Sequence, residues 1–323
     1  MSLPVTETSF DPVRSTQQLC LRSIEQMNKV VVGMDDVIQQ MLIAILAGGH
    51  VLLEGVPGVA KTTLSKLFAR ILGCEYQRIQ FTPDLLPSDV TGTSIFDRRT
   101  NDFVLRKGPI FCQILLADEI NRAPAKTQSA LLEAMQEYQV TVDGQTLSLP
   151  QPFFVLATQN PVEQEGVYRL PEAQLDRFLI KIQVGYPDHR AEVRMLQVHS
   201  KELVELQQQT TPAELLQIRS RLGEVFGKPE LFDYIVKLSE ESRTHPDLLL
   251  GASPRASLNI LKSARARALT QGRNYFTHED VQVVTPLVLG HRLIIRPEAE
   301  LEGKQISDIV KDLLASVPVV TSV

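Results

Sequence analysis

The chain has 323 residues, which is enough for two domains of ordinary size. Its apolar content of 43% suits a soluble globular protein, and no run reaches the roughly 18 apolar residues of a membrane span. The net charge of −5 disfavours nucleic acid as a partner, because phosphate binding depends on clustered Lys and Arg. The start of the chain lacks the pattern of a secretory signal, and the three scattered cysteines suit a reducing compartment, so we expect a cytoplasmic location.

The first half of the chain alternates between patterns of helix and strand. Apolar spacing predicts an amphipathic helix over Asp11–Asn28. The short apolar run His50–Glu54 is typical of a buried strand, and a helix is expected over Lys61–Leu72, where Gly73 ends it. Further runs predict four more strands and another helix, which favours an α/β fold with a doubly wound, parallel sheet. These runs are Gln77–Phe81, Gln113–Ala117, Phe153–Thr158 and Phe178–Val184 for strands, and Gln128–Tyr138 for the helix.

Two segments interrupt this alternation. A polar, turn-rich insertion lies near 91–109, and it contains the basic pair Arg98 and Arg99. The segment 139–149 alternates around Asp143-Gly144, which is a strong hairpin signal. We interpret the basic pair, and likewise Arg265 with Arg267, as solvated faces or pore elements.

After Pro187 the strand-like runs disappear and helical patterns dominate. The sequence therefore predicts an α/β core over 1–188 and a smaller, all-α domain over 189–323. The expected helices are Ala191–Lys201, Pro212–Phe226, Leu231–Glu241, Arg255–Thr270 and His278–Leu289.

A glycine-rich segment between the first predicted strand and its helix has the pattern of a phosphate-binding loop. Lys61 is placed to reach the β- and γ-phosphates of a nucleotide, and the Thr62 hydroxyl to ligate Mg²⁺. Ala60 stands where this pattern has glycine; its methyl group is tolerated in the α region and clashes in the left-handed region. The residues expected to contact the nucleotide are Gly55, Val56, Pro57, Gly58, Val59, Ala60, Lys61, Thr62 and Thr63.

Polar side chains end the next two strands of the predicted sheet. Asp118 and Glu119 follow an apolar strand, where Asp118 is expected to hold Mg²⁺ and Glu119 to polarise water as a general base. An acidic helix start that complements the helix dipole is the alternative. Asn160, at the end of the following strand, can donate to a γ-phosphate, although Asn before Pro also initiates turns. The pair of carboxylates favours hydrolysis over binding alone.

Four motifs together resemble the MoxR family of AAA+ ATPases, in the branch with a helix-2 insert. They are the phosphate loop, Leu115–Ala123, Ala157–Pro161 and Leu170–Phe178, within a similarity that covers Val30–Leu289. The resemblance implies that Ala60 is usual, that Arg177 is an arginine finger reaching a neighbour's ATP, and that Arg255 is a sensor-2 residue. It also implies that Val32 and Gly33 line the base pocket. Without the resemblance, each of the two arginines is more typical of a surface ion pair.

The resemblance implies an ATP-hydrolysing chaperone that assembles as a ring of identical subunits, expected to be a hexamer. Relatives of this kind remodel or activate client proteins, often with a partner that has a von Willebrand factor A domain. The ATPase subunit of a metal chelatase is the alternative, and a scaffold that binds ATP without hydrolysing it is an alternative from another class. Arg122 and Arg169 are candidates for subunit contacts, with no specific role assigned. ATP and Mg²⁺ are the expected ligands, and the absence of an Asn-Lys-x-Asp guanine motif agrees with adenine.

Overall fold

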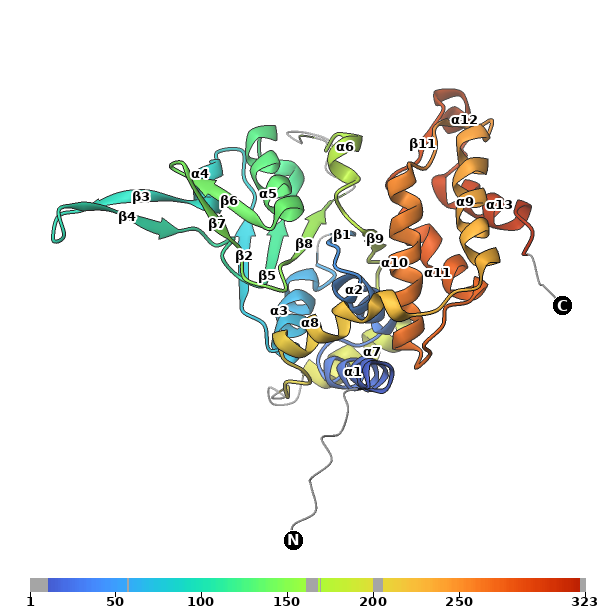
Figure 1. Cartoon of the computed structure of the whole chain (residues 1–323), viewed down its shortest axis with the longest axis horizontal. Coiled ribbons are helices and arrows are strands. Elements are labelled where there is room, and N and C mark those ends of the chain that lie inside the picture. The colour runs from blue at the N-terminus through green and yellow to red at the C-terminus, as the bar shows by residue number, and fades with distance from the viewer. Residues whose placement is uncertain (1–10, 57, 161–167, 169, 200–205, 320–323) are drawn as a thin grey trace, which may run out of the picture.

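The computed structural model describes residues 11–56, 58–160, 168, 170–199 and 206–319, so the predictions for Pro57 and Arg169 lie outside the described residues. Five strands form one central sheet in the order β2-β5-β8-β1-β9 (Figure 1). All four neighbouring pairs are parallel, which confirms the predicted α/β sheet. The strands are β1 (Val51–Glu54), β2 (Tyr76–Gln80), β5 (Ile114–Asp118), β8 (Phe154–Gln159) and β9 (Ile180–Gln183).

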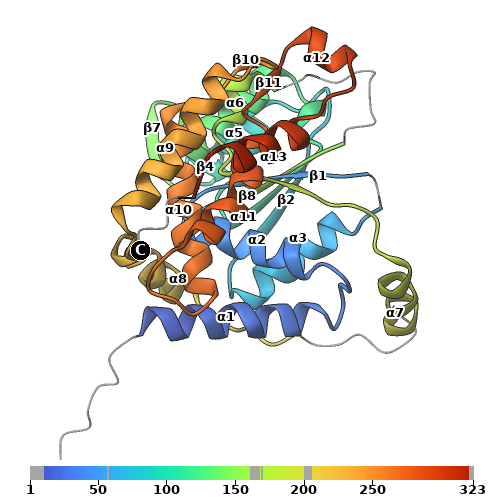
Figure 2. The ribbon, with the colours of Figure 1, turned by 90° about the vertical axis from the view of Figure 1, so that its right-hand side faces the viewer.

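Helices cover both faces of this sheet (Figure 2). Because successive side chains of a strand point to opposite faces, Val51 and Leu53 join one apolar cluster while Leu52 joins the other. The first cluster includes residues of three helices before β2, and the second includes residues of α5. These helices are α1 (Pro12–Met27), α2 (Asp35–Leu46), α3 (Lys61–Ile71) and α5 (Ala125–Glu137).

Helix α2 was not predicted from the sequence. The residues of its second half, Met41 to Leu46, are all buried, so the helix has no polar stripe over that stretch. A helix that is apolar on most of its faces lacks the 3.6-residue alternation by which surface helices are predicted. The helix is enclosed because α1, α8, α10 and β9 all contact it.

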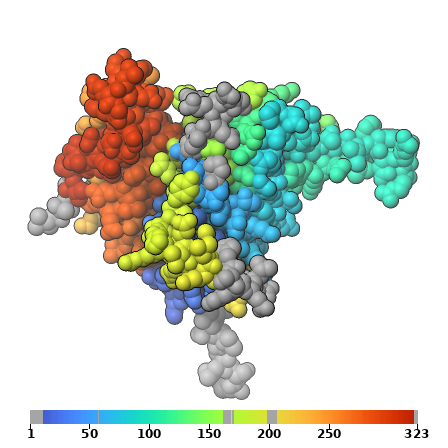
Figure 3. Space-filling view, turned by 180° about the vertical axis from the view of Figure 1, so that it is seen from behind, coloured from blue at the N-terminus to red at the C-terminus, as the bar shows by residue number. Residues whose placement is uncertain are grey.

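The insertion near 91–109, for which the sequence predicted only a polar and turn-rich segment, is a β-hairpin. Strands β3 (Gly92–Asp97) and β4 (Asp102–Lys107) pair antiparallel and project from the body of the molecule (Figure 3). Phe96 and Phe103 pair across the strands and are 51% and 69% exposed. The hairpin predicted near 139–149 is confirmed as β6 (Gln139–Val142) and β7 (Gln145–Ser148).

The second half of the chain is helical, apart from one small sheet. Strands β10 (Leu248–Leu250) and β11 (Ile294–Ile295) pair antiparallel, so the expectation that strands disappear after Pro187 is wrong at this point. The domain boundary near Pro187 stays a prediction. Short helices α4 (Pro87–Thr91) and α6 (Glu172–Leu175) belong to the first half. The later helices are α7 (His189–His199), α8 (Pro212–Ser220), α9 (Pro229–Thr244), α10 (Pro254–Thr270), α11 (His278–Leu289), α12 (Pro297–Leu301) and α13 (Ile306–Ser316).

The helical half shares its apolar core with one face of the sheet. Helix α10 contacts α1 and α2, and Ile260 and Ala264 of α10 belong to the same buried cluster as Val51 of β1. Burial of a shared apolar surface resists separation, at roughly 25 cal/mol per Å² removed from water. Within the described part of the chain, no helix is long and apolar enough to cross a membrane.

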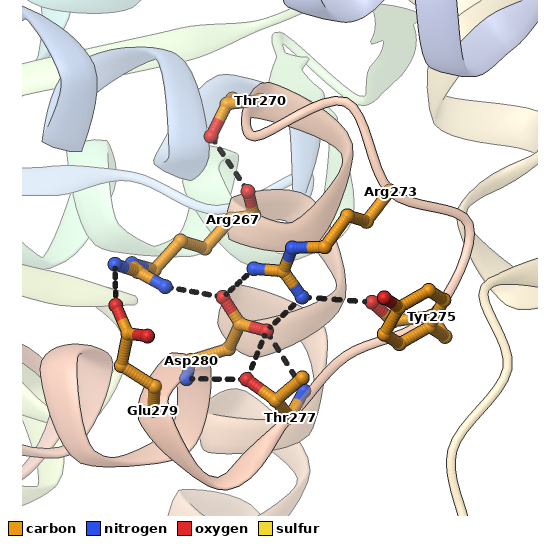
Figure 4. A network of polar contacts seen from close by, with 7 residues as sticks. All are labelled: Arg267, Thr270, Arg273, Tyr275, Thr277, Glu279 and Asp280. Atoms are coloured by element: carbon orange, nitrogen blue, oxygen red, sulfur yellow. Dashed lines mark hydrogen bonds and ion pairs between the residues drawn. The ribbon is translucent and has the colours of Figure 1, made fainter.

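A buried carboxylate joins α10 to α11 (Figure 4). The side chain of Asp280 is fully buried and accepts hydrogen bonds from Arg267, Arg273 and the Thr277 backbone N–H. Arg267 therefore belongs to a buried network, which corrects its assignment to a solvated face or pore. Burial by itself raises the pKa of Asp280, but the bonds from Arg273, Thr277 and Arg267 outweigh it and lower the pKa below its ordinary value of 3.8.

We expect Asp280→Ala to lower the free energy of unfolding by about 3–5 kcal/mol, because it leaves two partly buried guanidinium groups without their carboxylate. Urea denaturation of the whole chain measures this loss. Since the folded-state pKa is lowered, the stabilisation is complete above the ordinary value of 3.8 and is lost as the pH falls through the folded-state value. Asp308→Ala is the matched control, because its carboxylate pairs with Lys311 on the surface and should matter by less than about 1 kcal/mol. Equal losses in the two variants would contradict the assignment.

Candidate functional site

A polar cavity of about 340 Å³ lies where three adjacent strands end. The phosphate loop follows β1, the two carboxylates come at the end of β5, and Asn160 follows β8. Because β5, β8 and β1 are parallel neighbours, their carboxyl ends meet at one edge of the sheet. The structure thus brings together eight of the residues predicted for the nucleotide site. The cavity is lined by Gly58, Ala60, Lys61, Thr62, Thr63, Asp118, Glu119 and Asn160.

Lys61 begins helix α3 and turns back over the loop. Its Nζ donates to the Gly55 carbonyl oxygen at 2.6 Å. Burial lowers the pKa of Lys61, while the charges of Asp118, Glu119 and Glu54 oppose this effect. Gly55 lies against the end of β9, because a Cβ atom there would be 2.3 Å from the Val184 carbonyl oxygen. The first residue of the loop is therefore fixed by its contact with the backbone of Val184, and the Lys61 side chain lines the cavity.

Ala60 adopts the left-handed conformation, with φ of 56° and ψ of 23°. A Cβ atom in this region approaches the following carbonyl, at a cost of roughly 1–2 kcal/mol for residues other than glycine. Ala60 immediately precedes α3, whose first backbone N–H groups have no partner within the helix. The left-handed turn therefore directs the chain into a helix N-terminus that favours phosphate.

Both oxygens of Asp118 are held by neighbouring strands. Thr158 of β8 donates to Oδ1 at 2.6 Å, and Arg78 of β2 donates to Oδ2 at 2.7 Å. Asp118 is largely buried, so these bonds fix the direction of a carboxylate that opens toward the cavity. Thr62 lines the same cavity, and a hydroxyl beside a buried carboxylate is a donor set that suits Mg²⁺.

Glu119 is held through a single oxygen, Oε2. Gln80 donates to it at 2.7 Å and Arg122 at 2.9 Å, so Arg122 has a partner within its own chain. The backbone of Glu119 is left-handed, with φ of 55°, and its N–H donates to the Thr158 hydroxyl at 2.7 Å. A left-handed residue thus follows the strand directly, and its side chain lines the cavity.

Three of these partners were missed by sequence analysis: Arg78, Gln80 and Thr158. Arg78 and Gln80 are two residues apart on β2, so their side chains point to the same face of the sheet. This spacing of two polar residues can be recognised in the sequence. Their contacts with the two carboxylates depend on the parallel pairing of β2 with β5, in which Gln80 lies opposite Asp118. The order of the strands within the sheet was not predicted, so this neighbourhood could not be predicted either.

Arg177 and Arg255 lie together around a second cavity, of about 250 Å³. Arg177 precedes β9 and donates to the Leu132 carbonyl oxygen at 2.6 Å, while Arg255 lies in the first turn of α10, 3.9 Å from the Asp176 carboxylate. Gly48 and Gly49, which precede β1, also line this cavity, so it lies at the amino ends of the strands. No described residue lines both cavities.

Val32 and Gly33 lie in the turn before α2 and are not among the described residues that line the phosphate cavity. Gly33 has φ of 78° and packs closely on Ala191 of α7, where an added Cβ atom would approach to 2.8 Å. This contact connects the turn to the helix that follows β9. Their assignment to a base pocket stays a prediction.

The comparisons with known proteins agree with this geometry. Residues 50–180 match the model of the ATPase family associated with various cellular activities (AAA), and residues 240–313 match the AAA lid domain. The chain is 47% identical to the protein YeaC of Bacillus subtilis, over 92% of this chain and 94% of that one. It is 46% identical to Chaperone MoxR1 of Mycobacterium tuberculosis, over 86% of this chain and 76% of that one. A crystal structure of a protein proposed to be an ATPase, from Cytophaga hutchinsonii, superposes with a TM-score of 0.90 at 41% identity, over 96% and 97% of the two chains.

We expect Ala60→Gly to raise the free energy of unfolding by about 1 kcal/mol, because glycine adopts the left-handed conformation without a Cβ clash. Urea denaturation measures the change. Ala130→Gly is the matched control, since Ala130 lies inside α5 and glycine there should destabilise by about 0.5–1 kcal/mol. A loss of stability in both variants would show that the left-handed Ala60 carries no strain.

Proposed function

This chain belongs to the MoxR family of AAA+ ATPases, and we propose that it hydrolyses ATP to remodel, mature or activate client proteins. The observation that carries the proposal is one cavity lined by a phosphate loop with its lysine, two adjacent carboxylates and an asparagine. These are the groups that phosphoryl transfer requires, since its catalysis is mainly positioning and charge stabilisation. The relative from Mycobacterium tuberculosis is named a chaperone, which supports a client protein as the final target.

The loop residues 55–63 would bind the triphosphate. Lys61 and the N–H groups that begin α3 offer positive charge on one side of the cavity. Thr62 and Asp118 would hold Mg²⁺, which when bound neutralises charge that develops on the β- and γ-phosphates. Arg78 and Thr158 keep Asp118 in place for this task.

Glu119 would take the proton from the attacking water, and Asn160 would orient that water against the γ-phosphate. Gln80 and Arg122 both donate to Oε2 of Glu119, so the carboxylate is oriented before the substrate enters. A fixed base reduces the reorganisation that the reaction must otherwise include. Hydrolysis by this base distinguishes the proposal from a scaffold that only binds ATP.

Arg177 and Arg255 would act on the ATP of a neighbouring subunit. Strands of four to six residues separate the two edges of the sheet, which is about 13–20 Å at 3.3 Å per residue. An arginine side chain at the amino edge does not cover that distance to the phosphate loop of its own chain. A neighbour in a ring of identical subunits would bring an amino edge to the next phosphate cavity, through a head-to-tail interface.

We expect Lys61→Ala to weaken ATP binding sharply, because it removes the side-chain cation of the phosphate loop. Glu119→Gln keeps the shape of the side chain and removes the base, so ATP should bind while turnover falls by about 10²-fold or more. Equilibrium binding and phosphate release measure the two effects separately. Turnover of Glu119→Gln near the wild-type rate would refute the assignment of Glu119 as the general base.

Mixing subunits tests the action of Arg177 in trans. Arg177→Ala should bind ATP nearly normally and hydrolyse it poorly, since an arginine finger contributes about 10³–10⁵ in rate. Arg177→Ala and Lys61→Ala subunits are each expected to be inactive, but a mixed assembly contains interfaces that pair an intact loop with an intact finger. Partial activity should therefore return on mixing. If native mass spectrometry detects mixed assemblies and activity does not return, Arg177 is a structural residue.

A further inference from the structure

Arg292 is a buried arginine that joins the helical half of the chain to the segment before β9. It follows α11, and its side chain is only 3% exposed. Its Nε donates to Asp176 Oδ1 at 2.7 Å, and its other nitrogens donate to the carbonyl oxygens of Asp176, Phe178 and Leu179. A planar guanidinium group with this many fixed acceptors has one permitted orientation. The segment that contains Arg177 is thus held by backbone bonds on both sides of that residue.

Asp176 is shared by two arginines of the helical half. Its Oδ1 binds Arg292 at 2.7 Å, while Oδ2 lies 3.9 Å from Arg255, whose side chain is half exposed. The first contact is a short hydrogen bond in a buried setting, and the second is a longer ion pair beside the cavity. Arg255 can therefore leave Asp176 for a phosphate without leaving this partly buried carboxylate unpaired, because Arg292 still neutralises it.

We propose that Arg292 is a positioning residue for hydrolysis in the neighbouring subunit: through Asp176 it holds Arg177 and Arg255 on the same cavity. The inference rests on the proposed function, because it gives these two arginines their target. Arg292 itself does not line that cavity in the described chain, so it acts through Asp176 and the backbone of 176–179. A displacement of about 1 Å of such groups costs roughly 10²-fold in rate, which is the size of effect that the loss of Arg292 predicts.

Burial makes the contact sensitive to substitution. Desolvation lowers the pKa of Arg292, and the hydrogen bond and charge of Asp176 oppose this. Either partner without the other is a charge in a poorly solvated place, so the pair is kept together. His291 adjoins it and is buried, and burial together with the neighbouring Arg292 charge holds the pKa of His291 well below its usual value. The group next to Arg292 is therefore neutral and leaves Asp176 as its counter-ion.

The test assigns Arg292 to one side of the subunit interface. We expect Arg292→Gln and Asp176→Asn to bind ATP within about twofold of wild type and to hydrolyse it about 10²-fold more slowly. Mixed with Lys61→Ala, either variant should recover activity, since its own loop is intact and Lys61→Ala supplies the arginines. Mixed with Arg177→Ala, neither should recover activity, because every subunit then lacks a correctly placed Arg177 for the ATP of its neighbour. A variant that only damages the fold would recover with neither partner.

Arg221→Gln is the matched control, because Arg221 pairs with Glu224 on the surface and should leave activity unchanged. Asp176 is 26% exposed at its side chain, so Asp176→Asn decides the question if Arg292→Gln does not fold. Recovery with Arg177→Ala, or wild-type turnover by Asp176→Asn, would overturn the inference. If Arg177→Ala and Lys61→Ala fail to recover together in mixed assemblies, the action in trans is refuted, and the inference with it. The mixtures thus distinguish a failure of the role proposed for Arg292 from a failure of the action of Arg177 in trans.

Discussion

In a parallel sheet the carboxyl ends of all strands lie at one edge and the amino ends at the other. Here this constraint gathers the phosphate loop after β1, Asp118 at the end of β5 and Asn160 after β8 around one cavity. The same constraint puts Arg177, which precedes β9, at the far edge. The separation of the two groups does not depend on any side-chain rotamer, because it follows from the common direction of the strands in a parallel sheet.

Buried carboxylates hold the parts of the molecule in register. Asp118 is held by Arg78 and Thr158 from the neighbouring strands, and Asp280 of α11 is held by Arg267 of α10 and by Arg273 of the turn that joins these helices. In each case the acid and its partners come from different elements, so an error in packing would leave a charge unpaired. Such contacts add less to net stability than their number suggests, but they penalise every other arrangement.

The sequence allowed the prediction of those features that depend on local pattern. The phosphate loop, the five strands and the hairpin around Asp143-Gly144 follow from turn chemistry and apolar periodicity. Helix α2 was missed because the residues of its second half are all buried, and the Gln80–Glu119 bond was missed because it depends on strand order. The left-handed angle of Ala60 was posed as one of two alternatives, which only three-dimensional geometry distinguishes.

Helix α10 begins at one functional feature and ends at a structural one. Arg255 in its first turn lines the cavity at the amino edge, and Arg267 in its last turn binds Asp280. Its 17 residues form a rod of about 25 Å that contacts α1 and α2 along the way. Such a rod behaves as a lever: a tilt of about 5° at one end moves the other by about 2 Å, which is the scale of helix shifts at switching interfaces. Under the proposed function, a tilt of α10 as Arg255 engages a phosphate would therefore also shift the turn between α10 and α11, about 25 Å away.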